Sequence, residues 1–303
     1  MKNFIKISVP ILIFLFLTWR IGQNWQLIED RVFSVNFPLF ILALVVLVMT
    51  HVGGSFFWHK ILLILSLKIP FKESFRIFVI SNFGRFIPGV ILHYAARVYL
   101  GKKIGLGVKE GILSVFLEAY YTFAGGVIVS ILALPILSNF ISLIWLLPIS
   151  LTLIFLILVL PPRTIFDLAS KIPILGKKIP IAGFQVKYWE HYFLIGISAG
   201  LFLLNGMAFF LLASSFIENP FSRIFTLTGL FSSAWLVGFL TPVAPGGLGV
   251  TDLSFAYLLT TYYNFPLASF LAVAYRFGLL VTEGVVFLFV IKLFGFNLVG
   301  KKI

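Results

Sequence analysis

Two stretches of sequence decide the fold: Gly84-Arg85-Phe86-Ile87-Pro88-Gly89 and Thr241-Pro242-Val243-Ala244-Pro245-Gly246-Gly247-Leu248-Gly249. They interrupt two apolar segments, Phe75–Leu100 and Ile224–Tyr263. Gly and Pro at this density cannot sustain the hydrogen-bond ladder of a helix. In lipid, the freed amides and carbonyls need protein or water as partners. Each stretch therefore predicts two helices that meet at a break inside a membrane.

The composition of the whole chain agrees with a membrane environment. Of its 303 residues, 60% are hydrophobic and only 11% are charged, and the mean hydropathy is +1.10. Soluble domains are roughly 45–50% apolar and about 25% charged. A soluble fold of this composition would lack the polar side chains to cover its surface. This excludes a cytoplasmic globular enzyme, a disordered regulator and a nucleic-acid-binding module.

Six other apolar runs are uninterrupted and close to the ~20 residues that a helix needs to cross a bilayer. They are Phe4–Trp19, Phe37–Trp58, Gly111–Leu134, Phe140–Leu160, Tyr192–Phe216 and Leu267–Ile291. The first lacks a small-residue cleavage site after it, so we interpret it as a retained anchor and not a signal peptide. The sequence thus predicts an all-α polytopic membrane protein with about six full transmembrane helices and two broken segments.

Basic residues predict the orientation of these spans. The stretches 60–76, 97–109 and 161–187, together with Lys2, Lys6, Lys301 and Lys302, hold 17 of the 23 basic residues. Lys and Arg accumulate in cytoplasmic loops. Both termini are therefore predicted to be cytoplasmic, in an inner or plasma membrane, and no nucleic-acid partner is needed to explain the net charge of +13.

This orientation makes both broken segments re-entrant hairpins, one opening inward and one outward. Two complete but short spans on either side of Pro245 are the alternative for the second segment. Span, hairpin and span then occur twice with opposite orientation, which is typical of transporters with inverted repeats. The predicted organisation is an anchor and outer loop (1–36), a first repeat (37–134), a connecting span and basic loop (135–188), a second repeat (189–292) and a tail (293–303), all in one membrane domain.

Charged side chains inside the apolar segments are candidates for a site. Placing one at a helix centre costs roughly 2.5–3.5 kcal/mol, so such residues face the interior and pair with one another. Glu118 needs a cationic partner, for which Arg97 and Arg85 are candidates. Arg276 and Glu283, two helical turns apart, are predicted to face one cavity, and Asp252 is expected close to Arg276. Structural ion pairs are the alternative reading of these charges.

No sequence pattern indicates catalysis, a cofactor or a metal. The chain has no Cys, no phosphate-binding G-x-x-x-x-G-K-[ST] loop and no H-E-x-x-H. His51 and His59 carry no ligand spacing, and His191, at the start of a span, is predicted to face lipid headgroups. We expect no enzymatic activity, no cofactor and no metal site.

The strings around the two breaks resemble the lysylphosphatidylglycerol synthase transmembrane region family. Ser81-Asn82-Phe83-Gly84-Arg85-Phe86-Ile87-Pro88-Gly89, followed by Arg97, is similar to its N-x-G-[KR]-[YF]-[IL]-P-G … R pattern. Pro242 to Asp252 is similar to P-x-x-P-x-G-x-G-[VI]-x-E, with Asp in place of the usual Glu. Glu118 and the late Arg276 and Glu283 also match family positions.

The resemblance implies a flippase-like membrane domain without the soluble aminoacyl-transferase domain. We expect a lipid translocator that moves a phospholipid or polyprenyl-linked glycolipid with an anionic headgroup between leaflets. The alternative is a non-transporting scaffold that partners a glycosyltransferase or lipid-modifying enzyme. The predicted lipid-binding residues are Asn82, Arg85, Pro88, Gly89, Arg97, Glu118, Pro242, Pro245, Gly246, Gly247, Gly249, Asp252, Arg276 and Glu283.

Overall fold

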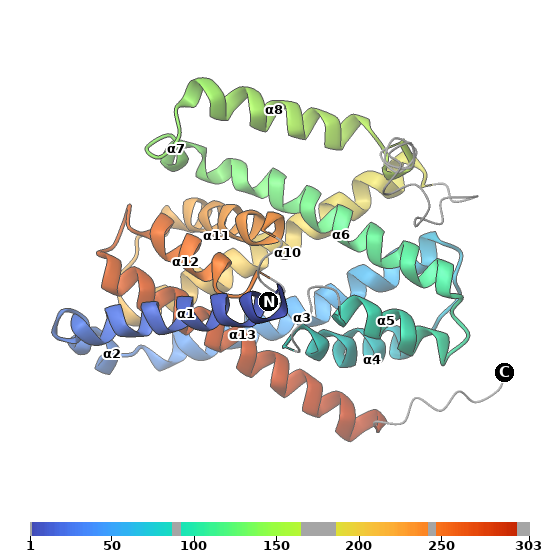
Figure 1. Ribbon diagram of the computed structural model, residues 1–303, viewed down its shortest axis with the longest axis horizontal. Helices are drawn as coiled ribbons and strands as arrows, with labels where there is room; N and C mark the ends of the chain where they lie inside the picture. Colours follow the sequence, from blue (N-terminus) through green and yellow to red (C-terminus); the bar gives the residue numbers. More distant parts are fainter. Residues whose placement is uncertain (1, 87–91, 165–185, 242–246, 296–303) are drawn as a thin grey trace.

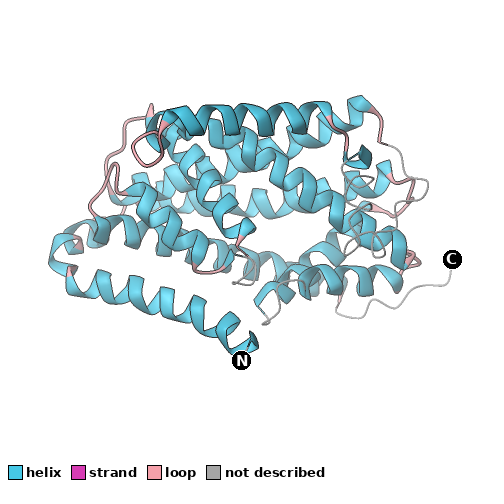
Figure 2. Ribbon diagram, turned by 45° about the horizontal axis from the view of Figure 1, so that its top comes forward, coloured by secondary structure: helices cyan, strands magenta, loops and turns pink. Residues whose placement is uncertain are grey.

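A computed structural model describes residues 2–86, 92–164, 186–241 and 247–295. This part of the chain is helical throughout and contains no strand (Figures 1 and 2). The helices are α1 (Lys2–Gln23), α2 (Glu29–Phe33), α3 (Phe37–Ile64), α4 (Phe71–Asn82), α5 (Leu92–Lys102), α6 (Val108–Ser130), α7 (Leu134–Leu137), α8 (Leu143–Val159), α10 (Tyr188–Phe216), α11 (Arg223–Leu240), α12 (Val250–Leu259) and α13 (Phe265–Phe294). The all-α fold predicted from the sequence is confirmed.

Among the described residues, five helical segments are long and apolar enough to cross a membrane. They are Phe37–Ile64, Val108–Leu137, Tyr188–Phe216, Arg223–Leu240 and Phe265–Phe294. Four of them contain predicted spans. The fifth, α11, was expected as half of a hairpin, yet its 18 residues reach about 27 Å at 1.5 Å per residue.

One of the predicted full spans is shorter in the structure. Helix α8 extends over Leu143–Val159, within the predicted run Phe140–Leu160. The other five predicted full spans lie within helical segments over their whole length, and Phe4–Trp19 lies inside the 22-residue α1. The turn at Phe140 explains why the run Phe140–Leu160 is not helical from end to end.

Both predicted helix breaks are confirmed. In the first half, α4 ends at Asn82, a short 3₁₀ turn covers Phe83–Phe86, and α5 begins at Leu92. In the second half, α11 ends at Leu240 and α12 begins at Val250. With 10 to 12 residues each, α4, α5 and α12 measure about 15–18 Å, roughly half of the ~30 Å hydrocarbon core.

The two halves of the molecule show matching sets of neighbours. In the first half α3 packs on α4, α4 on α5 and α5 on α6; in the second, α10 packs on α11, α11 on α12 and α12 on α13. The central helices α3 and α10 run antiparallel, since the amide of Asn36 donates to the carbonyl of Ser215 over 2.8 Å. Equivalent elements therefore run in opposite directions, as an inverted repeat requires. The proposed repeat boundaries at 37–134 and 189–292 stay a prediction.

Helix α8 lies at the outer edge of the bundle, against α6 (Figure 1). Its last carbonyls, which a helix leaves without internal partners, are bonded by side chains of neighbouring helices. Tyr120 donates to Leu160 O over 3.1 Å and Tyr192 to Leu158 O over 3.2 Å. His191 Nε2 lies 2.9 Å from Ile157 O, with its ring fully buried. The expectation that His191 faces headgroups was wrong, because it closes this helix end.

Candidate functional site

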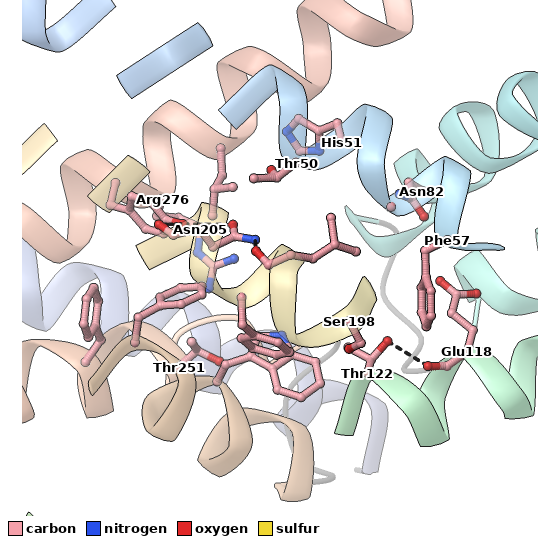
Figure 3. A pocket seen from close by; sticks show the side chains of 18 of the residues that line it. Thr50, His51, Phe57, Asn82, Glu118, Thr122, Ser198, Asn205, Thr251 and Arg276 are labelled. Atoms are coloured by element: carbon pink, nitrogen blue, oxygen red, sulfur yellow. Dashed lines mark hydrogen bonds between the residues drawn. The ribbon is translucent and has the colours of Figure 1, made fainter. Parts of the chain in front are cut away.

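A polar cavity of about 250 Å³ lies in the middle of the bundle (Figure 3). Seven helices line it: α3, α4, α6, α10, α11, α12 and α13. The lining comprises Thr50, His51, Gly54, Phe57, Phe78, Asn82, Glu118, Thr122, Ser198, Leu201, Phe202, Asn205, Phe231, Trp235, Thr251, Asp252, Phe255, Tyr275, Arg276 and Leu279. Arg276 and Glu118 lie on opposite sides of this space (Figure 3), so the cavity has a cationic side and an acidic side.

The acidic side depends on an ion pair between α5 and α6. Arg97 on α5 donates from Nη1 to Glu118 Oε2. Its Nε also donates to Ser81 Oγ over 3.0 Å, and its Nη2 to Asn82 Oδ1 over 2.6 Å. The Arg97 side chain is 1% exposed, and all three guanidinium nitrogens are therefore occupied by protein.

Aromatic rings complete the enclosure of Arg97. Its guanidinium carbon lies 4.2 Å from the centre of the Phe78 ring and 5.2 Å from that of Trp58. Such contacts favour a desolvated cation. The indole of Trp58 is itself fixed, since Nε1 donates to Ser114 Oγ over 3.2 Å. The pairing of Glu118 with Arg97 is confirmed, and Arg97 does not line the cavity.

The cationic side depends on a second ion pair, between α12 and α13. Arg276 Nε donates to Asp252 Oδ1 over 2.7 Å. Asp252 sits in the first turn of α12, where its Oδ2 accepts the amide of Gly249 over 3.0 Å. A carboxylate there also favours the positive end of the helix dipole. The predicted proximity of Asp252 to Arg276 and its place at the start of the returning helix are confirmed.

The two pairs occupy corresponding places with their charges exchanged. The first pair puts the base on the short helix α5 and the acid on the long helix α6. The second puts the acid on the short helix α12 and the base on the long helix α13. Glu118 follows the start of α6 by ten residues, and Arg276 follows the start of α13 by eleven. Because Glu118 and Arg276 lie at nearly the same distance from the starts of their helices, both side chains reach the same cavity.

Glycines bring α11 and the start of α12 into close contact below the cavity. A side chain at Gly238 would meet Thr251 Oγ1 at 1.9 Å, and one at Gly247 would meet the same atom at 2.7 Å. Gly247 also has a φ of +71° and Gly249 a φ of +78°, a region that L-residues rarely adopt. These two predicted site residues shape the backbone at the break.

The predicted site residues divide into three groups. Asn82, Glu118, Asp252 and Arg276 line the central cavity, whereas Glu283 lines a smaller adjoining one with His51 and Asn82. Arg97, Gly247 and Gly249 do not line the central cavity. Arg97 holds Glu118 and Asn82, and the two glycines shape the backbone at the second break. Pro88, Gly89, Pro242, Pro245 and Gly246 lie outside the described residues, as does the side chain of Arg85.

Sequence reasoning missed most of the uncharged polar lining. Asn205 is the clearest case: it bonds Leu201 O over 2.8 Å and accepts the hydroxyl of Tyr275 over 3.0 Å. An Asn in the middle of an apolar span could have indicated a residue that faces the protein interior, because an amide in lipid needs hydrogen-bond partners. Ser and Thr side chains readily bond to the backbone of their own helix. The residue types of Ser198, Thr50 and Thr122 therefore did not indicate a cavity.

The fold and the cavity define an integral, all-helical membrane protein with a polar site between two broken segments. The family model described as "Lysylphosphatidylglycerol synthase TM region" matches residues 7–293. The chain belongs to this family, as its two break sequences indicated. A comparison with curated proteins found no match.

Proposed function

We propose that the protein is a lipid translocator that moves a phospholipid or polyprenyl-linked lipid with an anionic headgroup between leaflets. The observation that carries the proposal is a cavity with both charges, lined by α4, α11 and α12 of the two broken segments. Intramembrane charges that face a cavity mark substrate pathways in membrane proteins. Broken helices at equivalent places are where transporters bind their substrates.

Arg276 is the proposed ligand of the lipid phosphate. Its Nε bonds Asp252, which leaves the two terminal nitrogens of the guanidinium toward the cavity (Figure 3). A guanidinium binds phosphate through paired, charge-assisted hydrogen bonds. Asp252 then acts as a positioning residue, because it fixes the Nε side and turns the opposite edge to the ligand.

The opposite side of the cavity would receive the rest of the headgroup. Glu118, Ser198 and Thr122 present carboxylate and hydroxyl groups there (Figure 3). Arg97 acts in this proposal by holding Glu118 and Asn82 in place and does not bind the lipid itself, in contrast to the lipid-binding role predicted from the sequence. As re-entrant hairpins, the broken segments would open the cavity to one leaflet and then to the other.

We further propose that the protein itself performs no covalent chemistry. A glycosyltransferase or lipid-modifying enzyme would supply or consume the transported lipid as a partner. Both termini are proposed to be cytoplasmic in an inner or plasma membrane. Because the chain has no Cys, single cysteines at Ser170 and Asn219 test this: an impermeant thiol reagent should label Asn219 in intact cells and leave Ser170 unlabelled. The opposite pattern would invert the orientation.

Lipid movement tests the function directly. Purified protein in liposomes should expose a fluorescent phosphatidylglycerol of the inner leaflet to dithionite added outside. Arg276→Gln should slow this movement about tenfold or more, since hydrogen bonds to charged groups contribute about 1.5–3 kcal/mol. Arg31→Gln, an exposed arginine on α2, is the control and should match the wild type. Equal rates with and without wild-type protein would reject the proposal in favour of a scaffold.

A further inference from the structure

An apolar groove lies between α1 and the chain segment that leads into α12. It measures about 370 Å³, compared with about 250 Å³ for the central cavity, and its described lining residues are Pro10, Ile11, Phe14, Leu15, Thr18 and Leu248. Along α1 the lining extends from Pro10 to Thr18, about 12 Å at 1.5 Å per residue. Thr18 is the polar side chain of this set, and its hydroxyl donates to Phe14 O over 2.8 Å. These side chains therefore offer a ligand carbon surface and no free hydrogen-bond donor.

The groove adjoins the central cavity at the start of α12. Leu248 lines the groove, whereas Thr251 and Asp252 line the central cavity. Gly249 lies between them: its amide donates to Asp252 Oδ2 over 3.0 Å, and its α-carbon lies against α1. A side chain at Gly249 would meet the Cα atom of Pro10 at 3.1 Å. One short stretch of backbone therefore separates a charged space from an apolar one.

Helix α1 precedes both proposed repeats and packs on α12 and α13 of the second. Leu17 on its inner side is fully buried in the largest hydrophobic core, and Ile13 packs against that core. Ile11 and Leu15, which border the groove, are 53% and 59% exposed. One side of α1 is thus fixed to the second repeat, so the groove on its other side keeps its place beside the second break.

This arrangement matches the two ends of a lipid. A lipid whose headgroup enters the central cavity must keep its hydrocarbon chains in an apolar environment. Asp252, which holds Arg276 at the cavity, is only four residues from Leu248 in the groove, so both ends of one molecule can be bound at the second break. Lipid tails are as apolar as leucine, so the groove gives a chain no hydrophobic gain over the bilayer. Its contribution is van der Waals contact and a fixed position.

We infer that the groove between α1 and Leu248 binds one hydrocarbon chain of the transported lipid while the headgroup occupies the central cavity. The inference rests on the proposed function. Helix α1 holds the chain beside the second break, so the phosphate can bind Arg276 and leave it again while the lipid stays in contact with the protein. The two ends belong to one molecule, and binding of the headgroup therefore raises the occupancy of the groove.

Photocrosslinking with two lipids tests this site. The probes are a phosphatidylglycerol and a diacylglycerol whose identical acyl chains carry a diazirine, each added to wild-type protein in liposomes. With phosphatidylglycerol, labelling of Ile11 and Leu15 should exceed several-fold the labelling of Leu151 and Phe155 on α8, which are each 63% exposed. With diacylglycerol, which has no phosphate for Arg276, the groove and α8 should be labelled equally.

A variant that fills the groove tests its role in lipid movement. Leu15→Trp should reduce the selective labelling of Ile11 by phosphatidylglycerol and slow lipid movement several-fold, because the larger side chain occupies the place of the hydrocarbon chain. Leu12→Trp is the matched control, since Leu12 lies on the same helix, is 60% exposed and does not line the groove. It should match the wild type in both measurements.

The outcomes separate this inference from the proposed function. Lipid movement by wild-type protein with equal labelling of the groove and α8 would overturn the chain site and leave the translocator intact. Equal labelling of the groove by the two lipids would also overturn it, because bulk lipid then fills the groove. A disulfide-linked dimer of Leu15→Cys in this Cys-free chain would assign the groove to a second copy instead. Selective labelling without lipid movement would reject the translocator and retain a lipid-binding groove.

Discussion

The ion pairs Arg97–Glu118 and Asp252–Arg276 occupy corresponding places in the two halves of the molecule, yet they differ in how much of each arginine is used. Arg97 bonds three side chains, is 1% exposed and lies over Phe78 and Trp58. Arg276 is 14% exposed and bonds Asp252 through Nε. The ion pair of the first half is thus enclosed by protein, whereas the ion pair of the second half leaves its arginine at the wall of a cavity.

The difference follows from what surrounds each arginine. In the first half, α4 brings Ser81, Asn82 and Phe78 around Arg97, and α3 brings Trp58; these groups replace the hydration of the guanidinium. In the second half, the loop between α11 and α12 supplies Asp252 with the Gly249 amide and leaves one edge of Arg276 toward the cavity. In the proposed function, the first ion pair therefore has a structural role and the second a binding role.

Removing Glu118 should have the largest effect on stability. Glu118→Gln leaves the enclosed Arg97 without its countercharge, which costs about 3–5 kcal/mol for a buried pair. We expect a large fall in yield and in the thermal unfolding temperature in detergent. Glu110→Gln, an exposed acid in the first turn of α6, is the control.

Arg97→Gln combined with Glu118→Gln sharpens this prediction. The double variant should be markedly milder than Glu118→Gln alone, because no desolvated charge remains. A double variant as unstable as the sum of the single ones would contradict a tightly coupled pair.

Asp252→Asn should cost less stability, about 1.5–3 kcal/mol, since Arg276 is partly exposed and Asn can still accept the Gly249 amide. Lipid movement should nevertheless fall strongly, because Arg276 loses the group that orients it. Asp252→Glu should retain activity, since Glu at this position of a helix also reaches back to the N-cap amide. Unfolding curves and the liposome assay measure the two effects separately. Greater instability in Asp252→Asn than in Glu118→Gln would reverse the comparison.

Gly247→Ala probes the contact beneath the second pair. A left-handed conformation costs an L-residue about 1–2 kcal/mol, and the new Cβ would lie 2.7 Å from Thr251 Oγ1. Gly105→Ala is a matched control, since Gly105 has a φ of +91° with nothing within 4 Å. We expect both variants to lose stability and Gly247→Ala alone to slow lipid movement. Equal lipid movement in the two would show that the contact is irrelevant to function.

Trp58→Phe should have the smallest effect, about 1 kcal/mol. It removes the hydrogen bond to Ser114 and weakens the cation–π contact between the ring and Arg97. The lipid-movement rate should stay close to that of the wild type, because Trp58 touches the first pair and does not line the cavity. Trp145→Phe, exposed on α8, controls for the change of residue type. A larger loss of transport than of stability would place the first pair in the lipid pathway.

Composition, periodicity and Gly-Pro breaks determined the local features of this protein. Apolar runs of about 20 residues and two interruptions are properties of continuous sequence, so the all-α membrane fold and both helix breaks could be predicted. The rarity of charges in apolar segments marked Glu118, Asp252, Arg276 and Glu283. Because buried charges must be compensated, Arg97 and Arg85 were the candidate partners of Glu118, and Arg276 was expected close to Asp252.

Only the tertiary structure decided which side of each helix meets the cavity. Helix rotation is set by packing against neighbours, which turned Arg97 away from the cavity and Arg276 toward it. It also brought His51 beside Thr282, 231 residues away in sequence, and placed Glu283 at a small cavity that His51 also lines. Sequence fixes where helices start and stop because backbone hydrogen bonding is local. The contacts between distant side chains arise from packing, and no short stretch of this chain encodes them.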